Sequence, residues 1–317
     1  MVAEKLVIGT RGSKLALWQA GYVAACLKEQ NSAVEVVLKH IITTGDKILD
    51  VPLARIGGKG LFTKELEKEL LSGEIDLAVH SLKDMPTELP PGLAIGAITQ
   101  RLEPGDALIS PRYRTLDNLP RGARIGTSSL RRKAQLLHYR PDLIVTDLRG
   151  NLDTRLAKLM ETELDAIVLA VAGLRRLNWD DRITEILPHD ICLPAVGQGA
   201  MAVETRENDP VVLPCLEPLH HRETEEAVAA ERAFLSELEG GCQVPIGVYG
   251  RIEAGVLVLD AAILSVDGQQ RIRDRITGTP REAAKLGTAL AQAMYEAGGR
   301  EILAGITGLG RTGRKEA

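Results

Sequence analysis

The chain has 317 residues, a hydrophobic fraction of 44% and a formal net charge of −4 at pH 7. This composition predicts a globular protein of two or three domains, with no apolar run long enough to span a bilayer. The four cysteines are far apart and form no CxxC pair, which argues against a zinc site and a disulfide framework. The first residues lack a signal-peptide pattern, so we expect a cytoplasmic protein.

The first two-thirds of the chain alternates short strand-like runs with helical runs, as in an α/β fold with a largely parallel sheet. The predicted strands are Leu6 to Ile8, Val34 to Leu38, Leu77 to Val79, Leu93 to Ala97, Ile144 to Thr146 and Ala166 to Leu169. The predicted helices are Lys14 to Lys28, Phe62 to Leu71, Leu130 to Leu137 and Leu152 to Met160.

A weak internal repeat indicates two similar lobes. Ile8-Gly9-Thr10 and Ile125-Gly126-Thr127 each read as a strand, a Gly-Thr turn and the start of a helix, and Glu74 to Val79 resembles Glu163 to Val168. Pro104-Gly105 and the prolines at 188 and 194 are plausible crossings between the lobes. A ligand is then expected in the cleft between the lobes, near helix N-termini. The predicted division is 1–100 with 200–217, then 101–199, then 218–317.

The pattern changes after Glu217-Pro218-Leu219. A helix from Glu223 to Leu238 precedes strand-like runs, a hairpin turn at Asp267-Gly268 and a last helix that reaches about Glu296. The runs are Val244 to Glu253, Val256 to Leu264 and Arg271 to Ile276. This third part reads as a small α+β domain.

Arginines recur where strands end and helices begin. They are Arg11, Arg131, Arg132, Arg149, Arg155, Arg175 and Arg176. The carboxyl ends of parallel strands lie at one edge of the sheet, where helix N-termini add positive potential. Arginine binds carboxylates there through two parallel hydrogen bonds. Each arginine alone could be a solvated charge, but together they predict a polyanion site. Ser13, Thr127, Ser128 and Ser129 would add hydroxyl donors, cap helices, or do both.

His80-Ser81-Leu82-Lys83-Asp84 follows a strand directly. Lys83 could hold a further carboxylate. Asp84 is an acid among bases, so it is either a salt-bridge partner or a group that holds an N–H and stabilises a transient cation.

Two glycine-rich segments suit close approach to a ligand. The first, Gly57 to Gly60, lacks the spacing of a nucleotide-binding loop and is interpreted as a lid. The second, Leu193 to Ala200, lies at a lobe crossing; both could equally be ordinary turns. His220-His221 has no neighbouring ligands that would make a metal site convincing, so no metal is expected.

Cys242 lies in Glu239-Gly240-Gly241-Cys242-Gln243-Val244-Pro245. Glycines clear space beside the thiol and Pro245 stiffens the other side, so a large group could be attached there. The alternative is a buried cysteine in a tight turn.

Several of these motifs together resemble the porphobilinogen deaminase family, also called hydroxymethylbilane synthase, over essentially the whole length. They are Thr10 to Leu17, Lys59 to Phe62, His80 to Pro86, Gly126 to Arg132, Leu148 to Asn151, Leu193 to Gly199 and Glu239 to Cys242. The resemblance implies two lobes like those of periplasmic binding proteins and a small α+β C-terminal domain. It also implies a transferase that deaminates four porphobilinogen molecules and joins them onto a dipyrromethane cofactor, which Cys242 holds by a thioether. Hydrolysis then releases the linear tetrapyrrole hydroxymethylbilane for tetrapyrrole and haem biosynthesis.

The resemblance also implies roles for single residues. Catalytic roles fall to Asp84, Lys83, Arg11, Arg149 and Arg155. Cofactor contacts fall to Cys242, Lys83, Asp84, Thr127, Ser128, Ser129, Arg131, Arg132, Arg149 and Gly150. Substrate contacts fall to Arg11, Ser13, Lys59, Phe62, Arg155, Arg176, Ala195, Gly197, Gln198 and Gly199. Asp84 would contact pyrrole nitrogens and stabilise the cation left when ammonia departs.

Two other hypotheses remain at this point. A two-lobed anion-binding module has no use for Cys242, and a thiol-nucleophile enzyme would need a base near it, which sequence cannot place. The family implies a monomer, with no nucleic-acid or membrane partner. Lys47, Arg101 and Arg112 are interpreted as plain surface charges.

Overall fold

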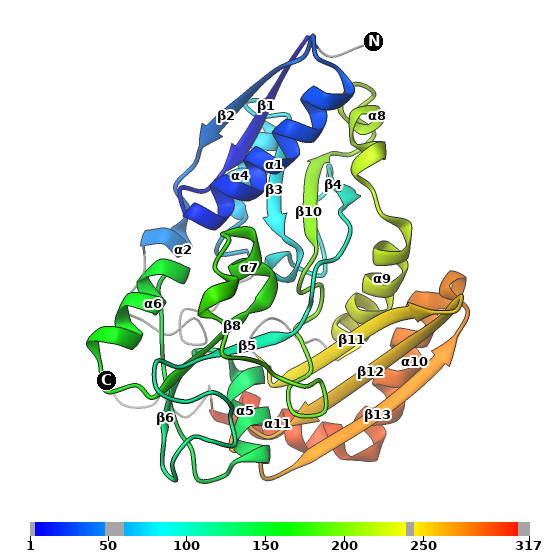
Figure 1. Cartoon of the computed structure of the whole chain (residues 1–317). Helices are drawn as coiled ribbons and strands as arrows, with labels where there is room; N and C mark the ends of the chain where they lie inside the picture. Colours follow the sequence, from blue (N-terminus) through cyan, green and yellow to red (C-terminus); the bar gives the residue numbers. More distant parts are fainter. Residues whose placement is uncertain (1–3, 48–59, 239–243, 310–317) are drawn as a thin grey trace, which may run out of the picture.

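The structure is a computed structural model that describes residues 4–47, 60–238 and 244–309, with side chains up to residue 306. Within these ranges the strands form two five-stranded sheets and one three-stranded sheet (Figure 1). The predicted class, two α/β lobes and a small α+β C-terminal unit, is confirmed.

The first sheet has the order β2-β1-β3-β10-β4, with β1 parallel to its neighbours and β10 antiparallel to both of its own. Its strands are β1 Lys5–Thr10, β2 Glu35–His40, β3 Leu77–Ser81, β4 Leu93–Ile98 and β10 Met201–Arg206. The helical segments of this lobe are α1 Lys14–Gln30, α2 Thr44–Lys47, α4 Lys64–Leu71, η1 Leu82–Asp84, α8 Val212–Leu216 and η3 Glu217–Leu219.

The second sheet repeats this arrangement, with the order β7-β6-β8-β5-β9 and the same pattern of parallel and antiparallel pairs. Its strands are β5 Asp106–Ile109, β6 Arg124–Gly126, β7 Ile144–Thr146, β8 Ala166–Ala170 and β9 Glu185–Ile186. The helical segments are α5 Leu130–Tyr139, α6 Leu152–Glu161, α7 Val171–Arg176 and η2 Asp180–Arg182. The predicted repeat is therefore real, because β1 and α1 correspond to β6 and α5.

Two segments, 99–105 and 187–200, carry the chain between the sheets. Because β10 completes the first sheet after the chain has passed through the second, both segments run between the lobes. The prolines and glycine that marked the crossings in the sequence lie in these two segments.

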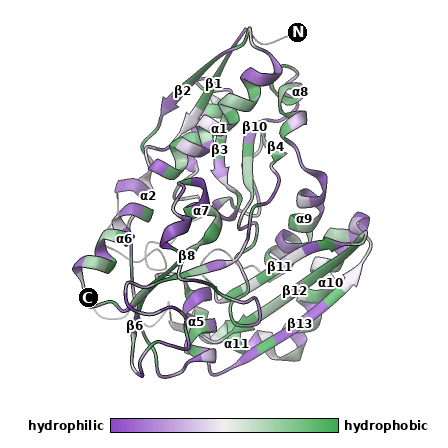
Figure 2. Cartoon of the chain, in the orientation of Figure 1, coloured by the Kyte–Doolittle hydropathy of each residue, from purple (hydrophilic) through white to green (hydrophobic). Residues whose placement is uncertain are grey.

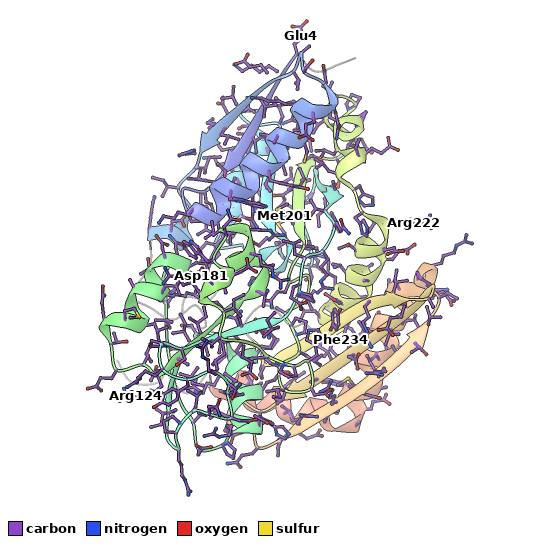
Figure 3. The ribbon with its side chains drawn as sticks, in the orientation of Figure 1. Glu4, Arg124, Asp181, Met201, Arg222 and Phe234 are labelled. Atoms are coloured by element: carbon purple, nitrogen blue, oxygen red, sulfur yellow. The ribbon has the colours of Figure 1, made fainter. Side chains whose placement is uncertain are left out.

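The C-terminal unit is a three-stranded antiparallel sheet with α9 and α10 packed on it. Its elements are α9 Arg222–Glu237, β11 Ile246–Glu253, β12 Val256–Leu264, β13 Arg271–Gly278, η4 Pro280–Glu282, α10 Ala283–Met294, η5 Tyr295–Gly299 and α11 Arg300–Leu309. The middle strand β12 is the most hydrophobic of the three (Figure 2). Phe234 is fully buried where α9 meets the sheet (Figure 3).

Most predicted elements match the structure, and the misses are instructive. The second predicted helix begins at Lys64 in the structure, two residues after its predicted start at Phe62. Strands β5 and β10 and helix α7 were not predicted. Helix α10 ends at Met294 and continues into η5, where Gly298 at φ +112° breaks the helical path before α11, which was not predicted.

Arg101 was wrongly interpreted as a plain surface charge. Its side chain is 10% exposed and its Nη1 lies 2.6 Å from Oε1 of Glu231, which is fully buried. Arg101 also donates to the backbone oxygen of Gln198, and Glu231 accepts from the backbone N–H groups of Gly197 and Gly250. One ion pair thus joins both crossing segments to α9 and β11 of the C-terminal unit.

Replacing Arg101 with Met should lower the free energy of unfolding by about 3 kcal/mol, because it leaves the Glu231 carboxylate buried without its charge partner. Chemical denaturation measures this. Arg222→Met is the matched control: Arg222 also pairs with a glutamate but is 73% exposed, so its loss should cost no more than about 0.5 kcal/mol. Equal effects of the two changes would contradict the role of Arg101.

Candidate functional site

A pocket lies between the two lobes and encloses about 470 Å³ of empty space, including its open mouth. Helix α1 and the end of β3 line it from the first lobe, and α5, α6, β8 and α7 line it from the second. The crossing segment closes it at residues 198–200. The lining residues are Leu15, Ser81, Lys83, Arg132, Leu152, Arg155, Leu169, Ala170, Ala172, Gly173, Arg176, Gln198, Gly199 and Ala200.

All four charged residues in this lining, Lys83, Arg132, Arg155 and Arg176, are basic. Burial and, to a smaller extent, the nearby guanidinium groups of Arg132 and Arg149 lower the pKa of Arg155 to about 10. Burial also lowers the pKa of Arg176 to about 10. The pocket therefore destabilises the protonated form of these guanidinium groups, and a bound anion would stabilise it.

Arg176 was expected at the start of a helix, and this is wrong, because it is the last residue of the short helix α7. The helix carries its side chain into the pocket, where it is 4% exposed. Its Nη2 donates to the backbone oxygen of Gly199 at 2.7 Å, while its buried Nε has no hydrogen-bond partner among the described residues. A buried donor without a partner in a cationic pocket is available to a ligand acceptor.

Lys83 and Asp84 lie on η1, directly after β3. Burial and, to a smaller extent, the charge of Arg132 lower the pKa of Lys83 to about 8, against the opposing effect of Asp84. The Lys83 Nζ also donates to Oε1 of Gln198 at 3.3 Å, across the lobes. Asp84 is exposed, so its carboxylate is accessible beside the half-buried ammonium group.

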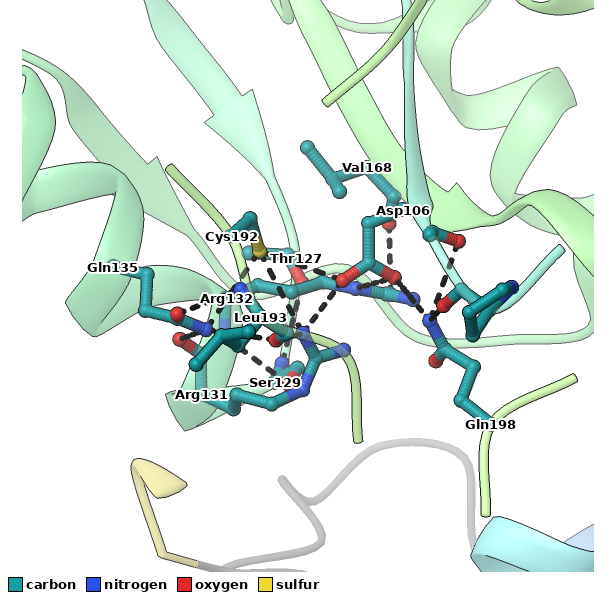
Figure 4. A network of polar contacts seen from close by, with 12 residues as sticks. Asp106, Thr127, Ser129, Arg131, Arg132, Gln135, Val168, Cys192, Leu193 and Gln198 are labelled. Atoms are coloured by element: carbon teal, nitrogen blue, oxygen red, sulfur yellow. Dashed lines mark hydrogen bonds and ion pairs between the residues drawn. The ribbon is translucent and has the colours of Figure 1, made fainter. Parts of the chain in front are cut away.

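Arg131 and Arg132 were expected to face ligand carboxylates, yet both are already paired to a buried aspartate, Asp106, at the start of β5 (Figure 4). Arg131 Nη1 lies 2.6 Å from Oδ2 and Arg132 Nη2 lies 2.7 Å from Oδ1. Burial would raise the pKa of Asp106, but the two guanidinium groups hold it far below its usual range. Of the two arginines, Arg132 lines the pocket.

The predicted hydroxyl groups have structural partners. Ser13 and Ser129 are the N-caps of α1 and α5 and accept from the backbone N–H three residues on. Thr127 accepts from the N–H of Ser129, and Ser128 accepts from that of Leu148. The helix-capping interpretation of Ser13 and Ser129 is therefore confirmed, and a ligand contact remains a prediction.

Arg149 and Gly150 lie in the loop between β7 and α6. Gly150 has φ +118°, and its carbonyl accepts from Nε of Arg155 at 2.8 Å. The loop thus fixes the direction of the Arg155 side chain. Arg149 lies close enough for its charge to lower the pKa of Arg155.

Arg11 lies at the end of β1 beside a group that the sequence analysis missed. It forms an ion pair with Asp46, and its guanidinium lies 4.2 Å from the ring centre of Phe62. Asp46 has a lowered pKa because Arg11 and Thr43 donate to it, against the effect of burial. Arg11 and Phe62 are therefore brought together, as expected of two substrate contacts, but not in the lining of this pocket.

The crossing segment at 195–199 requires its glycines. Gly197 and Gly199 have φ +69° and +98°. A Cβ on Gly199 would lie 2.5 Å from the carbonyl oxygen of Leu102, and one on Gly197 would lie 2.8 Å from the side chain of Leu82. This close packing presents Gln198 to the pocket, while Ala195 lies outside its lining.

Cys242 and Lys59 lie outside the described residues, so the structure places neither of them. Among the residues that it does describe, there is no group of three or more His, Cys, Asp or Glu side chains that could hold a metal ion. In those same ranges no helix has the length and apolar character to cross a membrane.

Three acidic residues that organise this region, Asp46, Asp106 and Glu231, were missed at the level of sequence. Asp106 had a signal, since it is a lone acid between the Pro104-Gly105 crossing and the apolar run Ala107 to Ile109. Asp46 and Glu231 had none, because their partners are 35 and 130 residues away.

Family comparisons agree with this geometry. The model described as "Porphobilinogen deaminase, dipyromethane cofactor binding domain" matches residues 6–213, and "Porphobilinogen deaminase, C-terminal domain" matches residues 226–296. The chain belongs to the porphobilinogen deaminase family. The first match contains every described residue that the sequence analysis assigned to the site.

Relatives named porphobilinogen deaminase match nearly end to end. The protein of Desulforamulus reducens is 54% identical over 95% of this chain and 97% of its own. That of Geobacter sulfurreducens is 52% identical over 96% of both chains. Among solved structures, the alkanesulfonate-binding protein SsuA of Xanthomonas axonopodis pv. citri, bound to MOPS, is 15% identical, with a TM-score of 0.36 over 75% of this chain and 76% of its own.

The lowered pKa of Lys83 predicts that anion binding weakens as the pH rises through about 8. Below this pH the ammonium is charged and attracts the anion, and above it binding should fall by up to about tenfold per pH unit. Calorimetry measures the affinity for citrate between pH 7 and 9. The protein used is the Cys242→Ser variant, because it cannot carry a thioether-linked group in the pocket.

The control variant is Lys83→Arg in the same background, because a guanidinium stays charged throughout this range. It should bind citrate with little dependence on pH. A citrate affinity that is constant from pH 7 to 9 with Lys83 present would show that Lys83 does not contact the anion.

Proposed function

We propose that the pocket between the lobes binds the carboxylates of the dipyrromethane cofactor and of the growing pyrrole chain. The observation that carries this proposal is the lining itself, in which every charged side chain is basic. The protein is a hydroxymethylbilane synthase: it deaminates four porphobilinogen molecules, joins them onto the cofactor and hydrolyses the product free. Each pyrrole unit carries an acetate and a propionate, so the chain that it builds is a polyanion.

The residues present fit such a cofactor. A dipyrromethane with four carboxylates needs several cations within reach of one another, and the pocket holds four. The buried Nε of Arg176, without a partner among the described side chains, supplies a donor for one of these carboxylates. When bound, the cofactor supplies the free pyrrole carbon to which the next unit is joined.

The cations of the pocket come from both lobes and share the task of holding carboxylates in this proposal. Arg132 and Arg155 come from α5 and α6 of the second lobe, and Lys83 comes from η1 of the first. A carboxylate held between them ties the two lobes together. The same roles are proposed for Arg11, Ser13, Ser129, Arg131, Arg149 and Arg176, with Thr127, Ser128, Gly150, Ala195, Gly197, Gln198 and Gly199 as backbone or polar contacts.

Asp84 is proposed as the electrostatic catalyst. Its carboxylate is exposed next to the half-buried Lys83. Loss of ammonia from porphobilinogen leaves a cation, and a carboxylate beside it lowers the energy of the transition state. The same carboxylate can accept the pyrrole N–H and so fix the orientation of the reacting ring. Lys83, beside Asp84, is proposed to bind a substrate carboxylate.

We also propose the division 1–100 with 200–217, 101–199 and 218–317. Its support is that each sheet draws its strands from one of these parts, since β10 returns to the first sheet at Met201. The proposal also includes three further roles: a lid residue at Lys59, a stacking partner at Phe62 and the cofactor anchor at Cys242. A monomer in the cytoplasm without nucleic-acid partners completes it, and light scattering on a sizing column tests the monomer.

Intact mass spectrometry of the freshly purified protein tests the function. The mass should exceed that of the chain by two linked pyrrole units, and the protein should give a colour with an aldehyde reagent for free pyrroles. Cys242→Ser should lose both, while Cys215→Ser, which changes a half-buried cysteine beside the first core, should keep both. An active preparation with the unmodified chain mass would contradict the covalent cofactor.

Asp84→Ala should lower the rate of porphobilinogen consumption by about 100- to 1,000-fold, as expected when an electrostatic contact to a transition state is removed. Its circular dichroism and denaturation midpoint should stay unchanged because Asp84 is exposed. Asp181→Ala, which changes an exposed carboxylate on η2 (Figure 3), should keep full activity. Near-normal turnover by the Asp84 variant would remove that residue from the mechanism.

A further inference from the structure

Asp106 is the most heavily coordinated carboxylate near the pocket, although it does not line the pocket itself. It is fully buried at the first position of β5, immediately after the crossing segment. It accepts from Nη1 of Arg131, from Nε and Nη2 of Arg132, from Nε2 of Gln198 and from the thiol of Cys192. These partners come from α5 and from the second crossing segment, so the carboxylate ties separate parts of the chain to one point (Figure 4).

Gln198 passes this constraint on to the first lobe. Its Nε2 donates to Oδ1 of Asp106 at 2.9 Å and to the carbonyl of Pro104 at 2.6 Å. With both acceptors on the nitrogen side, the amide oxygen must point the other way, and it accepts from Nζ of Lys83 at 3.3 Å. Asp106, together with the carbonyls of Pro104 and Gly105, thereby sets which end of the Gln198 amide faces Lys83.

We propose that Asp106 is a positioning residue, which holds Arg132 and Gln198 directly, and Lys83 through Gln198, in the arrangement that binds the substrate's carboxylates. This inference rests on the proposed function of the pocket and adds a residue that does not touch the ligand. Arg131 acts with it, since its Nη1 also donates to the carbonyl of Leu193 at 2.7 Å and so fixes the other part of the crossing segment.

The negative charge of Asp106 and its positioning of the cations have opposite effects on the affinity of the pocket for carboxylates. A buried anion reduces the positive potential of the pocket, so its removal would strengthen the attraction for carboxylates if potential alone mattered. A positioning role predicts weaker binding instead, because two buried guanidinium groups without their shared partner repel each other and leave their orientation. The direction of the change therefore separates the two roles.

Asp106→Asn is the test, because it keeps the shape and one acceptor oxygen but removes the charge. Steady-state kinetics should show a KM for porphobilinogen at least about tenfold higher than that of the wild type, the loss expected for one charge-assisted contact. An unchanged or lower KM would overturn the proposal. Asp260→Asn is the matched control: Asp260 is also buried and bridges two arginines, Arg251 and Arg275, on the C-terminal sheet. It should lower stability without raising KM.

A second readout follows Lys83 directly and does not depend on turnover. Competitive acetylation over pH 6 to 11, analysed by peptide mass spectrometry, gives the midpoint at which Lys83 loses its proton. In the Cys242→Ser background, adding Asp106→Asn should move this midpoint to lower pH by about half a unit or more, because a nearby anion and an oriented acceptor both favour the ammonium form. No movement of the midpoint would overturn the link through Gln198.

Gln198→Leu keeps the test decisive if the Asp106 variant does not fold. It breaks the link to Lys83 but leaves the buried ion pairs of Asp106 in place. The Lys83 midpoint should again fall, and an unchanged midpoint would overturn the proposal. If the proposed function is wrong, the result is different: the wild-type protein lacks the mass excess and does not consume porphobilinogen. This outcome does not depend on the midpoint measured for Lys83.

Discussion

The confinement of several positive charges in one pocket is the constraint on which this structure depends. Lys83, Arg132, Arg155 and Arg176 are held together in a lining that contains no negative charge. Burial lowers the pKa values of Lys83, Arg155 and Arg176, and neighbouring guanidinium groups contribute for Lys83 and Arg155. Such an arrangement costs stability in the absence of an anion. The fold tolerates this cost at the place where the ligand is bound.

Acidic residues outside the lining pair with arginines in and around the pocket. Asp106 pairs with the two arginines of α5, Asp46 pairs with Arg11 and Glu231 pairs with Arg101. Of the arginines in these pairs, Arg132 lines the pocket, so Asp106 is the acid that anchors a pocket guanidinium directly. The geometry of the binding surface thus depends on acids that do not line the pocket.

The sequence predicted the fold well where local patterns carry the information. Strand β12 was predicted with its observed bounds, and the Gly-Thr turns before α1 and α5 revealed the repeat. Strand β5 was missed because its four residues are all buried and show no alternation. The cations of the site could be found because arginines at strand ends are visible one by one. The pairing of these cations with acids could not be predicted, since Asp106 lies 25 and 26 residues from its arginines and 92 from Gln198. Its place before an apolar run marked Asp106 itself but not its partners.

The late position of β10 in the chain, after all strands of the second sheet, also has a consequence for the order of folding. The second sheet is built entirely from residues 106–186, so all its strands exist once residue 186 has left the ribosome. The first sheet has a gap between β3 and β4 until β10 emerges, which ends at Arg206. The lobe that begins the chain is therefore the later of the two to be completed during synthesis. Until then, the facing edges of β3 and β4 lack their partner strand.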